Sequence, residues 1–345
     1  MMTTLGGRIV RDLGVSDIQT ALSIVREQLK SSPADVGAHL RYAELLTAAF
    51  QHDAALVAIE RAVAAAGGAA QFKAALDRKV CVVVSNCHGK AIRATFAEVP
   101  AFEERYLVVG VYNRDAATIP KAITEIADVL IFQATTWSQV SEDALVKGLS
   151  SAVQVIRFPA AMLSALWPYY TRAPSKTDES GRPVYRYAYG DRFIDQRVKL
   201  GMAPDAIVAE YMSRDVPSDV NLLRLMEIES AKEHEKERQC EIRVRGFIED
   251  NFHRIPVFHT PNHPTQPVIN HMANQIARHL DLAVDPETLS RAEYPETSAT
   301  QHPIHPSIAQ HLGLPYVPPQ AKFRMARSTA LSFEEFIPRY IAGSI

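Results

Sequence analysis

The chain reads Val80-Cys81-Val82-Val83-Val84-Ser85-Asn86-Cys87-His88-Gly89 and then continues into an amphipathic segment at residues 90–98. Five apolar residues in a row predict a buried strand, and the spacing after residue 89 is typical of a helix. A cysteine in the turn between them lies near the unpaired N–H groups and positive dipole end of the helix, which favours its thiolate form. Cys87 is therefore a candidate nucleophile. The alternative is that it is only a small residue that fits the turn.

The residues that follow show the same alternation of strand and helix. Apolar runs of strand length occur at residues 80–84, 106–112, 129–132 and 153–158, with helical stretches between them. This pattern predicts an α/β fold, with a mainly parallel sheet covered by helices on both faces in a flavodoxin-like layout. Ligands collect at the carboxyl ends of such strands. Polar residues stand at that end of each run: Cys87, Asn113, Gln133 and Arg157. A helix cap or an ordinary loop residue is the structural alternative for the last three.

Residues 15–70 contain a helical repeat. An offset of 34 residues aligns Leu22 with Leu56 and Val25 with Ile59, and that period is typical of tetratricopeptide repeats. The segment resembles one and a half such repeats, too few to form a solenoid alone, so we expect it to pack on the following domain or on another copy. Its role would be to dock a protein partner or to act as a structural lid.

The predicted division is a helical tetratricopeptide-like segment at residues 1–74 and an α/β domain at residues 75–345. The second part contains a helical insertion and a C-terminal tail. Its aromatic stretch around Trp167 and Tyr189 suits a ligand platform or a small core. We expect one long helix at residues 219–250, capped by Ser218 or Asp219, with a solvated face at residues 232–238, and another helix at residues 268–280. The tail is expected to pack back through Phe333, Phe336 and Tyr340.

Composition excludes several classes of function. With 37 basic and 39 acidic residues among 345, the formal charge is −2, which predicts no general affinity for nucleic acid or anionic membranes. The weakly polar stretch at residues 54–70 carries Glu60 and Arg61, so membrane insertion is not expected. Three cysteines and the absence of a cationic-then-apolar leader argue against a disulfide scaffold and for a cytoplasmic protein.

A second polar cluster, Phe258-His259-Thr260-Pro261-Asn262-His263-Pro264-Thr265, lies far downstream. Cysteine catalysis usually needs a histidine that is distant in sequence. His263 is the better candidate base, because the flanking prolines and Asn262 fix its loop, and His259 is the second candidate. In another mechanism His263 deprotonates a substrate hydroxyl directly and Cys87 only lines a thioester pocket. The prolines stop His259 and His263 from sharing a helix face, so no metal site is expected.

Three short motifs carry a family resemblance: Asn86-Cys87-His88, Ile131-Phe132-Gln133 and the stretch at residues 260–265. Over residues 78–282 the chain resembles the WcbI-type capsular polysaccharide biosynthesis proteins. Members of that family usually have Asn-Cys-Gln where this chain has Asn86-Cys87-His88, so His88 replaces the glutamine. The resemblance implies binding of coenzyme A and acetyl transfer to a sugar of a surface polysaccharide, with the cysteine and the histidine motif in the site. The layout is also similar to that of SGNH-type esterases, whose nucleophilic serine follows the first strand. In this chain Cys87 would take the place of that serine, and Asn262 would stand near where that family has an acid.

The turn after Cys87 and the phosphates of coenzyme A indicate further candidate site residues. N–H groups beyond Cys87 are the best oxyanion donors, because the turn presents them already oriented. Coenzyme A carries phosphates, so a nearly neutral chain must supply cations locally. The predicted oxyanion and substrate contacts are Asn86, His88, Gly89, Gln133, Asn262 and His259, and the predicted cofactor contacts are Ser85, Lys90, Arg93, Arg114 and Arg157.

Three hypotheses of function remain open at this point. The first is an O-acyltransferase that takes coenzyme A or acetyl-CoA as donor and a glycan as acceptor. The second is an SGNH-like hydrolase with Cys87 as nucleophile, which would cleave small esters without coenzyme A. The third is a scaffold that binds a ligand without turnover and recruits a partner through its repeats.

Overall fold

The computed structural model describes residues 15–49, 51–113, 119–134, 146–172, 176–177, 183–184, 189–291, 300–325 and 329–343. Contacts divide the chain into two compact units. Unit 1 comprises Met1–Ala160, Gln239–Arg243 and Ile269–Glu293, and unit 2 comprises Ala161–Arg238, Val244–Val268 and Tyr294–Ile345. The boundary predicted near residue 74 falls inside unit 1. The two units are described separately below.

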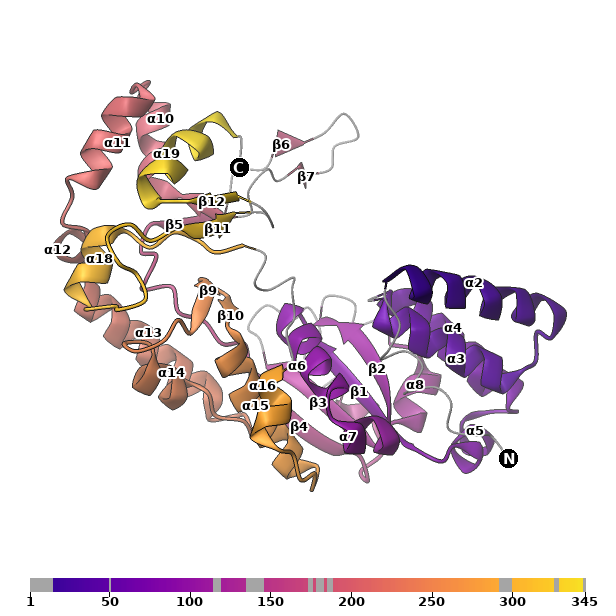
Figure 1. Ribbon diagram of the computed structural model, residues 1–345. Coiled ribbons are helices and arrows are strands. Elements are labelled where there is room, and N and C mark those ends of the chain that lie inside the picture. The colour runs from indigo at the N-terminus through magenta and orange to yellow at the C-terminus, as the bar shows by residue number, and fades with distance from the viewer. Residues whose placement is uncertain are drawn as a thin grey trace. The chain divides into compact units, whose positions relative to one another are not determined.

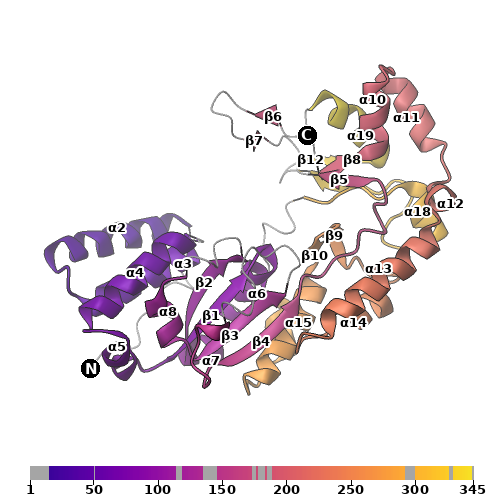
Figure 2. The same ribbon diagram turned by 180° about the vertical axis from the view of Figure 1, so that it is seen from behind.

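Unit 1 is built on a parallel sheet of four strands (Figures 1 and 2). The strands are β1 (Lys79–Ser85), β2 (Tyr106–Tyr112), β3 (Val129–Ala134) and β4 (Gln154–Pro159), in the order β2-β1-β3-β4. All three pairings are parallel. The predicted α/β fold is confirmed, and each strand lies within two residues of the apolar run that predicted it. The carboxyl ends of the strands meet at one edge, as the flavodoxin-like order requires.

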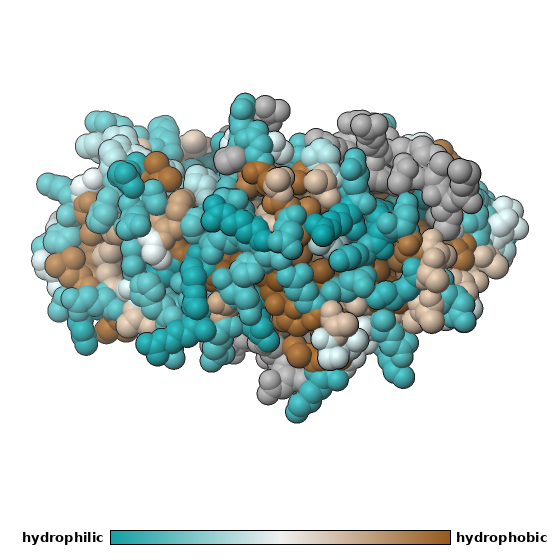
Figure 3. All heavy atoms as spheres, turned by 90° about the horizontal axis from the view of Figure 1, so that it is seen from below, coloured by the Kyte–Doolittle hydropathy of each residue, from teal (hydrophilic) through white to brown (hydrophobic). Residues whose placement is uncertain are grey.

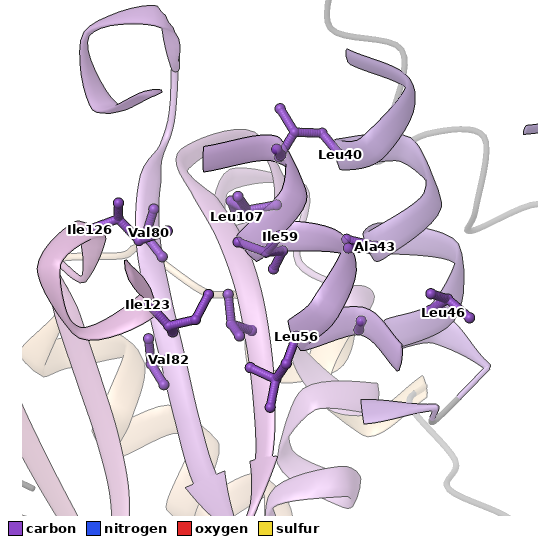
Figure 4. Packing of buried hydrophobic residues seen from close by; sticks show 14 of the residues in the cluster. Leu40, Ala43, Leu46, Leu56, Ile59, Val80, Val82, Leu107, Ile123 and Ile126 are labelled. Atoms are coloured by element: carbon purple, nitrogen blue, oxygen red, sulfur yellow. The ribbon is translucent and has the colours of Figure 1, made fainter. Parts of the chain in front are cut away.

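Helices cover both faces of this sheet. The side chains of β1 point alternately to the two faces, so each face of β1 packs against a different helix. Val80, Val82 and Val84 pack with residues of α8 (Lys121–Ile126) in one core (Figure 4). On the other face, Val83 and Ser85 lie against Gly89 in α6 (Cys87–Ala97). Strand β1 is therefore buried on both sides, which explains why its sequence is apolar from Val80 to Val84.

The N-terminal segment is helical, as its repeat predicts. It forms α2 (Val15–Ser31), α3 (Val36–Ala48), α4 (His52–Ala65) and α5 (Ala69–Ala75). The positions paired by the 34-residue offset are buried in both copies: Leu22, Val25, Leu56 and Ile59. They share a single core with β1, β2 and β3, and Figure 4 shows Ile59 beside Leu107 of β2. Of the two expected arrangements, on the following domain or on another copy, the structure shows the first.

Helix α15 (Gln266–His279) agrees with the helix predicted at residues 268–280. Its carboxyl end is held in unit 1 by two side chains. Arg105, at the end of α7 (Pro100–Arg105), donates to the carbonyl of Leu280 at 2.9 Å, and Gln154 of β4 donates to the carbonyl of His279 at 2.6 Å. Helix α16 (Pro286–Arg291) follows.

The prediction of a single long helix at residues 219–250 is wrong. The structure has α12 (Val216–Val220), α13 (Leu222–Glu237) and α14 (Arg245–Asn251) instead. Asn221 adopts a left-handed conformation with φ 50° and caps α13, so neither Ser218 nor Asp219 does. The carboxylate of Glu237 accepts the N–H groups of Val244 and Arg245, both at 2.7 Å. Glu237 is the last residue of α13, and its carboxylate caps the start of α14.

The solvated face expected at residues 232–238 is also partly wrong, because Glu233 and Glu237 are buried. Glu229, one turn earlier, is buried as well and accepts N–H groups of Ser164 and Ala165 at 2.6 and 3.0 Å. Glu229 and Glu237 bond to backbone groups outside their own helix, which a helical charge pattern does not reveal.

Unit 2 combines short helices with two-stranded ladders. The further helices are α10 (Arg192–Lys199), α11 (Pro204–Met212), α18 (Pro306–His311) and α19 (Phe333–Ala342). The ladders pair β5 (Tyr170–Arg172) with β8 (Tyr189–Asp191), β6 (Lys176–Thr177) with β7 (Pro183–Val184), β9 (Phe258–Thr260) with β10 (His263–Pro264), and β11 (Phe323–Met325) with β12 (Thr329–Leu331). Strand β9 begins at Phe258, the first residue of the histidine cluster.

The C-terminal tail packs back on unit 2, as predicted. Phe333 lies edge-on to Tyr211, and Phe336 is buried against His302. The Tyr340 hydroxyl donates to Asp195 of α10 at 2.8 Å. Trp167 and Tyr189 are only 5% and 6% exposed, so these two aromatic residues belong to the core. Tyr185, Tyr187 and residues 292–299 lie outside the described residues.

Hydrophilic side chains predominate on the face drawn in Figure 3, with hydrophobic residues between them. Within the described part of the chain, no single helix has both the length and the apolar composition to cross a membrane. Helices α4 and α5 meet that test only when taken together, and they are bent by 93°.

Candidate functional site

Asn86 shapes the turn that carries Cys87. Its side-chain oxygen caps α6 by accepting the N–H of His88 at 3.0 Å. Gly89, in the first turn of this helix, approaches β1 so closely that an added Cβ would lie 1.6 Å from Ser85 Oγ. Glycine is therefore required at position 89 if Ser85 keeps its place. Ser85, predicted to contact the cofactor, is buried under this glycine.

Gln133, at the carboxyl end of β3, holds the same turn from the neighbouring strand. Its side chain is fully buried, and its Oε1 accepts the N–H of Asn86 at 2.8 Å. A backbone N–H can only donate, so the other end of the carboxamide must be the NH₂ group, which lies 2.8 Å from Nδ1 of His88. His88 Nδ1 is thus an acceptor, and the ring carries its proton on Nε2. Gln133 acts here as a clamp between β3 and the turn.

His88 itself is buried, with 1% of its surface exposed. The departure from the usual Asn-Cys-Gln motif therefore places an imidazole inside unit 1, bonded to Gln133, rather than at the surface. The predicted oxyanion donors are engaged in this structure. His88 N–H is bonded to the Asn86 side chain, and Gly89 N–H lies 3.2 Å from the Asn86 carbonyl oxygen. An oxyanion would have to compete with Asn86 for them.

All three cysteines lie in described residues, and no disulfide joins them. Cys81 and Cys240 are buried, and burial raises the pKa of the Cys81 thiol to about 12. Cys87 is partly exposed, and its Sγ lies 3.8 Å from Oδ1 of Asn86. Of the three thiols, Cys87 is the one that a substrate in solution can reach at a helix N-terminus.

The predicted cofactor cations differ in what they contact. Arg93 donates to the carbonyl oxygen of Thr47 at 3.1 Å, which ties α6 to α3. Arg157 forms an ion pair with Glu241 at 3.1 Å. Lys90 places its ammonium 5.6 Å from the centre of the Tyr112 ring at the end of β2. Arg114 lies outside the described residues.

Asn113 follows β2 directly and is only 8% exposed. Neither its Oδ1 nor its Nδ2 has a hydrogen-bond partner among the described residues. Most buried amides are paired, so this one is unusual. Because Ser85 pairs with Tyr112 across the sheet, Asn113 follows β2 at the same edge at which Asn86 follows β1.

The histidine cluster lies in unit 2, on the hairpin formed by β9 and β10. Nδ1 of His263 lies 2.5 Å from the hydroxyl of Tyr189 and 2.9 Å from that of Thr260. Those two hydroxyls are 3.1 Å apart, and Thr260 Oγ1 lies 3.2 Å from Oδ1 of Asn262. Two hydroxyls thus lie at Nδ1 of the imidazole, and Asn262 lies behind one of them.

Burial dominates the electrostatics of both histidines in this hairpin. It lowers the pKa of His263 to about 4, and the neighbouring His259 adds to this effect. The pKa of His259 is also lowered to about 4, first by burial and then by Arg324. Nδ1 of His259 is buried without a hydrogen-bond partner among the described residues. At neutral pH both rings are therefore uncharged, and a neutral imidazole is the form that can take up a proton.

The structure thus brings Asn86, Cys87, His88 and Gln133 together in unit 1, and Thr260, Asn262 and His263 together in unit 2. The sequence did not indicate Tyr189 as the partner of His263. A tyrosine 74 residues before the histidine carries no local signal, although it stands next to Gly190 in an aromatic stretch. Among the described residues, no group of three or more His, Cys, Asp or Glu side chains could hold a metal ion.

The fold and these residues define an α/β protein with a thiol at the helix that follows its first strand and a neutral histidine in a later hairpin. The profile of the family described as "Polysaccharide biosynthesis enzyme WcbI" matches residues 80–285. That match spans more than half of the 345 residues, so the chain belongs to the WcbI polysaccharide biosynthesis enzyme family. The helices α2 to α5 precede the matched region.

A solved structure of WcbI is similar to this one, with a TM-score of 0.61 and 15% sequence identity. The similarity covers 78% of this chain and 89% of that chain. At this level of identity it shows a shared fold. That structure is described as a native polysaccharide biosynthesis enzyme without a disulfide bond between coenzyme A and one of its cysteines. No curated protein matched the chain.

Proposed function

We propose that this protein is an acyl-CoA-dependent O-acyltransferase that transfers an acyl group, acetyl in the simplest case, to a sugar hydroxyl of a surface polysaccharide. Membership of a family of polysaccharide biosynthesis enzymes supports a glycan substrate. The description of the similar WcbI structure names coenzyme A, which supports a thioester donor. The observation that carries the proposal is the placement of Cys87, partly exposed at the start of α6 in a turn fixed by Asn86 and Gln133.

Cys87 gives the reaction a covalent route. Its thiolate attacks the thioester carbonyl, the bond from that carbonyl to coenzyme A breaks, and the thiolate of coenzyme A leaves and takes up a proton. The sugar hydroxyl then attacks the acyl-cysteine, and the Cys87 thiolate is restored. The positive end of the α6 dipole favours negative charge at each stage. His88 N–H becomes a donor to the oxyanion only when the Asn86 side chain releases it.

His263 is proposed as the base that takes the proton from the sugar hydroxyl. Its low pKa keeps the ring neutral at physiological pH, so no proton has to be lost first. The same base would also serve a direct route, in which the sugar attacks acyl-CoA and Cys87 lines the thioester pocket. Detection of an acyl group on Cys87 separates the two routes.

Lys90 is the proposed contact for a phosphate of coenzyme A. Arg93 and Arg157 have bonds within unit 1, to Thr47 and Glu241, that a phosphate would have to displace. The ammonium of Lys90 lies 5.6 Å from the centre of the Tyr112 ring, on a flexible stem that can turn toward an anion.

The test is a calorimetric titration of the protein with coenzyme A and with acetyl-CoA. We expect saturable micromolar binding that Lys90→Ala weakens and that the control Lys30→Ala, in an exposed pair with Glu27, leaves unchanged. Intact-mass measurement after mixing with acetyl-CoA should show one acetyl group on the wild type and none on Cys87→Ala. Absence of binding to a folded protein would contradict the proposal and favour a hydrolase or a scaffold.

A further inference from the structure

The base proposed above can work only in one tautomer. Nδ1 of His263 points at the hydroxyls of Tyr189 and Thr260, so the nitrogen left for a substrate is Nε2. Nε2 can accept a proton only if the ring already carries its proton on Nδ1. In enzymes with a serine or cysteine nucleophile a carboxylate usually selects this tautomer. No Asp or Glu in the described part of the chain bonds to His263, so another group must select it.

Counting protons over the four contacts identifies that group. Thr260 has one hydroxyl proton, and Oδ1 of Asn262, 3.2 Å away, can only accept. Thr260 therefore donates to Asn262. Its oxygen is left as an acceptor for Tyr189, 3.1 Å away, and the oxygen of Tyr189 is left as an acceptor for Nδ1 of His263, 2.5 Å away. Over these four contacts each donor has one acceptor, and the last acceptor is the amide oxygen of Asn262.

The other tautomer fits the same distances less well. With Nδ1 unprotonated, Tyr189 donates to His263 and Thr260 still donates to Asn262. No proton then lies between the two hydroxyl oxygens at 3.1 Å. The contact between Thr260 and Nδ1 at 2.9 Å has no proton of its own in either tautomer. The tautomer with a proton on Nδ1 supplies three protons to these four contacts, whereas the other supplies two. Tyr189 is 6% exposed and Thr260 is fully buried, so water does not readily replace either.

We propose that Tyr189 and Thr260 are positioning residues which, with Asn262 as terminal acceptor, hold the proton of His263 on Nδ1 and leave Nε2 as the base. This series of hydrogen bonds contains no charged group. It therefore fixes the tautomer and the ring orientation of His263, but it does not stabilise an imidazolium by an ion pair, as a carboxylate does. The kinetic consequence rests on the proposed function. The tautomer itself does not, because it is a property of the protein without substrate.

The experiment is nitrogen-15 NMR of protein labelled in histidine, with the His263 signals assigned from a His263→Gln variant. The wild type should show a protonated Nδ1. Tyr189→Phe keeps the buried ring and removes the middle of the chain, so the signal should move toward a mixture of tautomers, and Thr260→Val should act in the same direction. Tyr316→Phe is the matched control: it also removes a buried phenol bond, to the carbonyl of Phe252 at 2.8 Å, and should leave His263 unchanged.

The acyl-transfer assay adds a second readout. Tyr189→Phe should lower kcat by about ten-fold or more while the affinity for coenzyme A stays within the range of the Tyr316→Phe control. A wild type protonated on Nε2, or a Tyr189→Phe variant with the wild-type tautomer, would overturn the inference whatever the assay gives. Failure to bind coenzyme A or to transfer an acyl group would instead overturn the proposed function and leave the tautomer measurement valid.

Discussion

At the scale of single residues, two buried carboxamides at the same edge of the sheet have opposite environments. Gln133 uses both ends of its amide, for Asn86 N–H and His88 Nδ1. Asn113 uses neither end among the described residues. Burying a polar group costs free energy unless it is bonded, so the same kind of substitution should act differently at the two positions.

Gln133→Met should lower the free energy of unfolding by about 1–3 kcal/mol, because the N–H of Asn86 and Nδ1 of the buried His88 lose their bonds to its amide. Asn113→Leu, the matched variant, should leave this free energy unchanged or raise it, because no bond is lost among the described residues. Urea denaturation of both variants measures the difference. Equal losses would mean that the clamp of Gln133 does not stabilise the turn.

Gly89 is the other residue whose identity the turn requires. In Gly89→Ala the new methyl group would meet Ser85, with Oγ at 1.6 Å and Cβ at 2.3 Å, so the helix or the strand must shift. We expect a loss of about 1–3 kcal/mol in the free energy of unfolding, together with weaker binding of coenzyme A. Gly246→Ala in α14 has nothing within 4 Å of the added atom and should be neutral or stabilising. The expectation fails if both alanines behave alike in thermal denaturation.

At the scale of elements, sequence-based prediction succeeded where the structure depends on neighbouring residues and failed where it depends on contacts between residues separated in the sequence. The strands and the turn with Cys87 could be predicted because continuous apolar runs and a strand-to-helix junction are local patterns. The break between α13 and α14 could not, because it depends on the bonds of Glu237 to Val244 and Arg245. The pairing of Tyr189 with His263 spans 74 residues and was missed for the same reason.

Glu237 gives a direct test of that explanation. Glu237→Ala leaves two buried N–H groups unpaired, so we expect it to lower the free energy of unfolding by about 2 kcal/mol or more. Glu235 stands on the same helix in an exposed pair with Arg238, with 65% of its side chain accessible. Glu235→Ala should change this free energy by less than about 0.5 kcal/mol. A reversed order of the two variants in urea denaturation would contradict the role given to Glu237.

At the scale of the whole molecule, buried histidines make stability depend on pH. Burial lowers the pKa of His259 and His263 to about 4 and that of His302 to about 3, from a usual 6.5. Between about pH 4 and 6.5 the unfolded chain therefore binds more protons than the folded one at these sites. Asp191 acts in the opposite direction, because burial raises the pKa of its carboxyl from 3.8 to about 6.

At pH 5 these four groups leave the unfolded chain with about two more protons than the folded one, so the free energy of unfolding should rise with pH across this window. Urea denaturation at a series of pH values between 4 and 7 measures the slope. His302→Gln should make the slope shallower, and Asp191→Asn should make it steeper. A stability that is flat or falls as the pH rises would contradict the burial of these histidines.

The most direct measurement of the central claim follows the acyl group itself. The wild type is mixed with radiolabelled acetyl-CoA and a deacetylated surface polysaccharide, beside the Cys87→Ala and His263→Ala variants. The account predicts label in the polysaccharide for the wild type, and at least about a hundred-fold less for His263→Ala, which has lost its base. Label released only as free acetate, or equal transfer by all three proteins, would contradict an acyltransferase that uses Cys87 and His263.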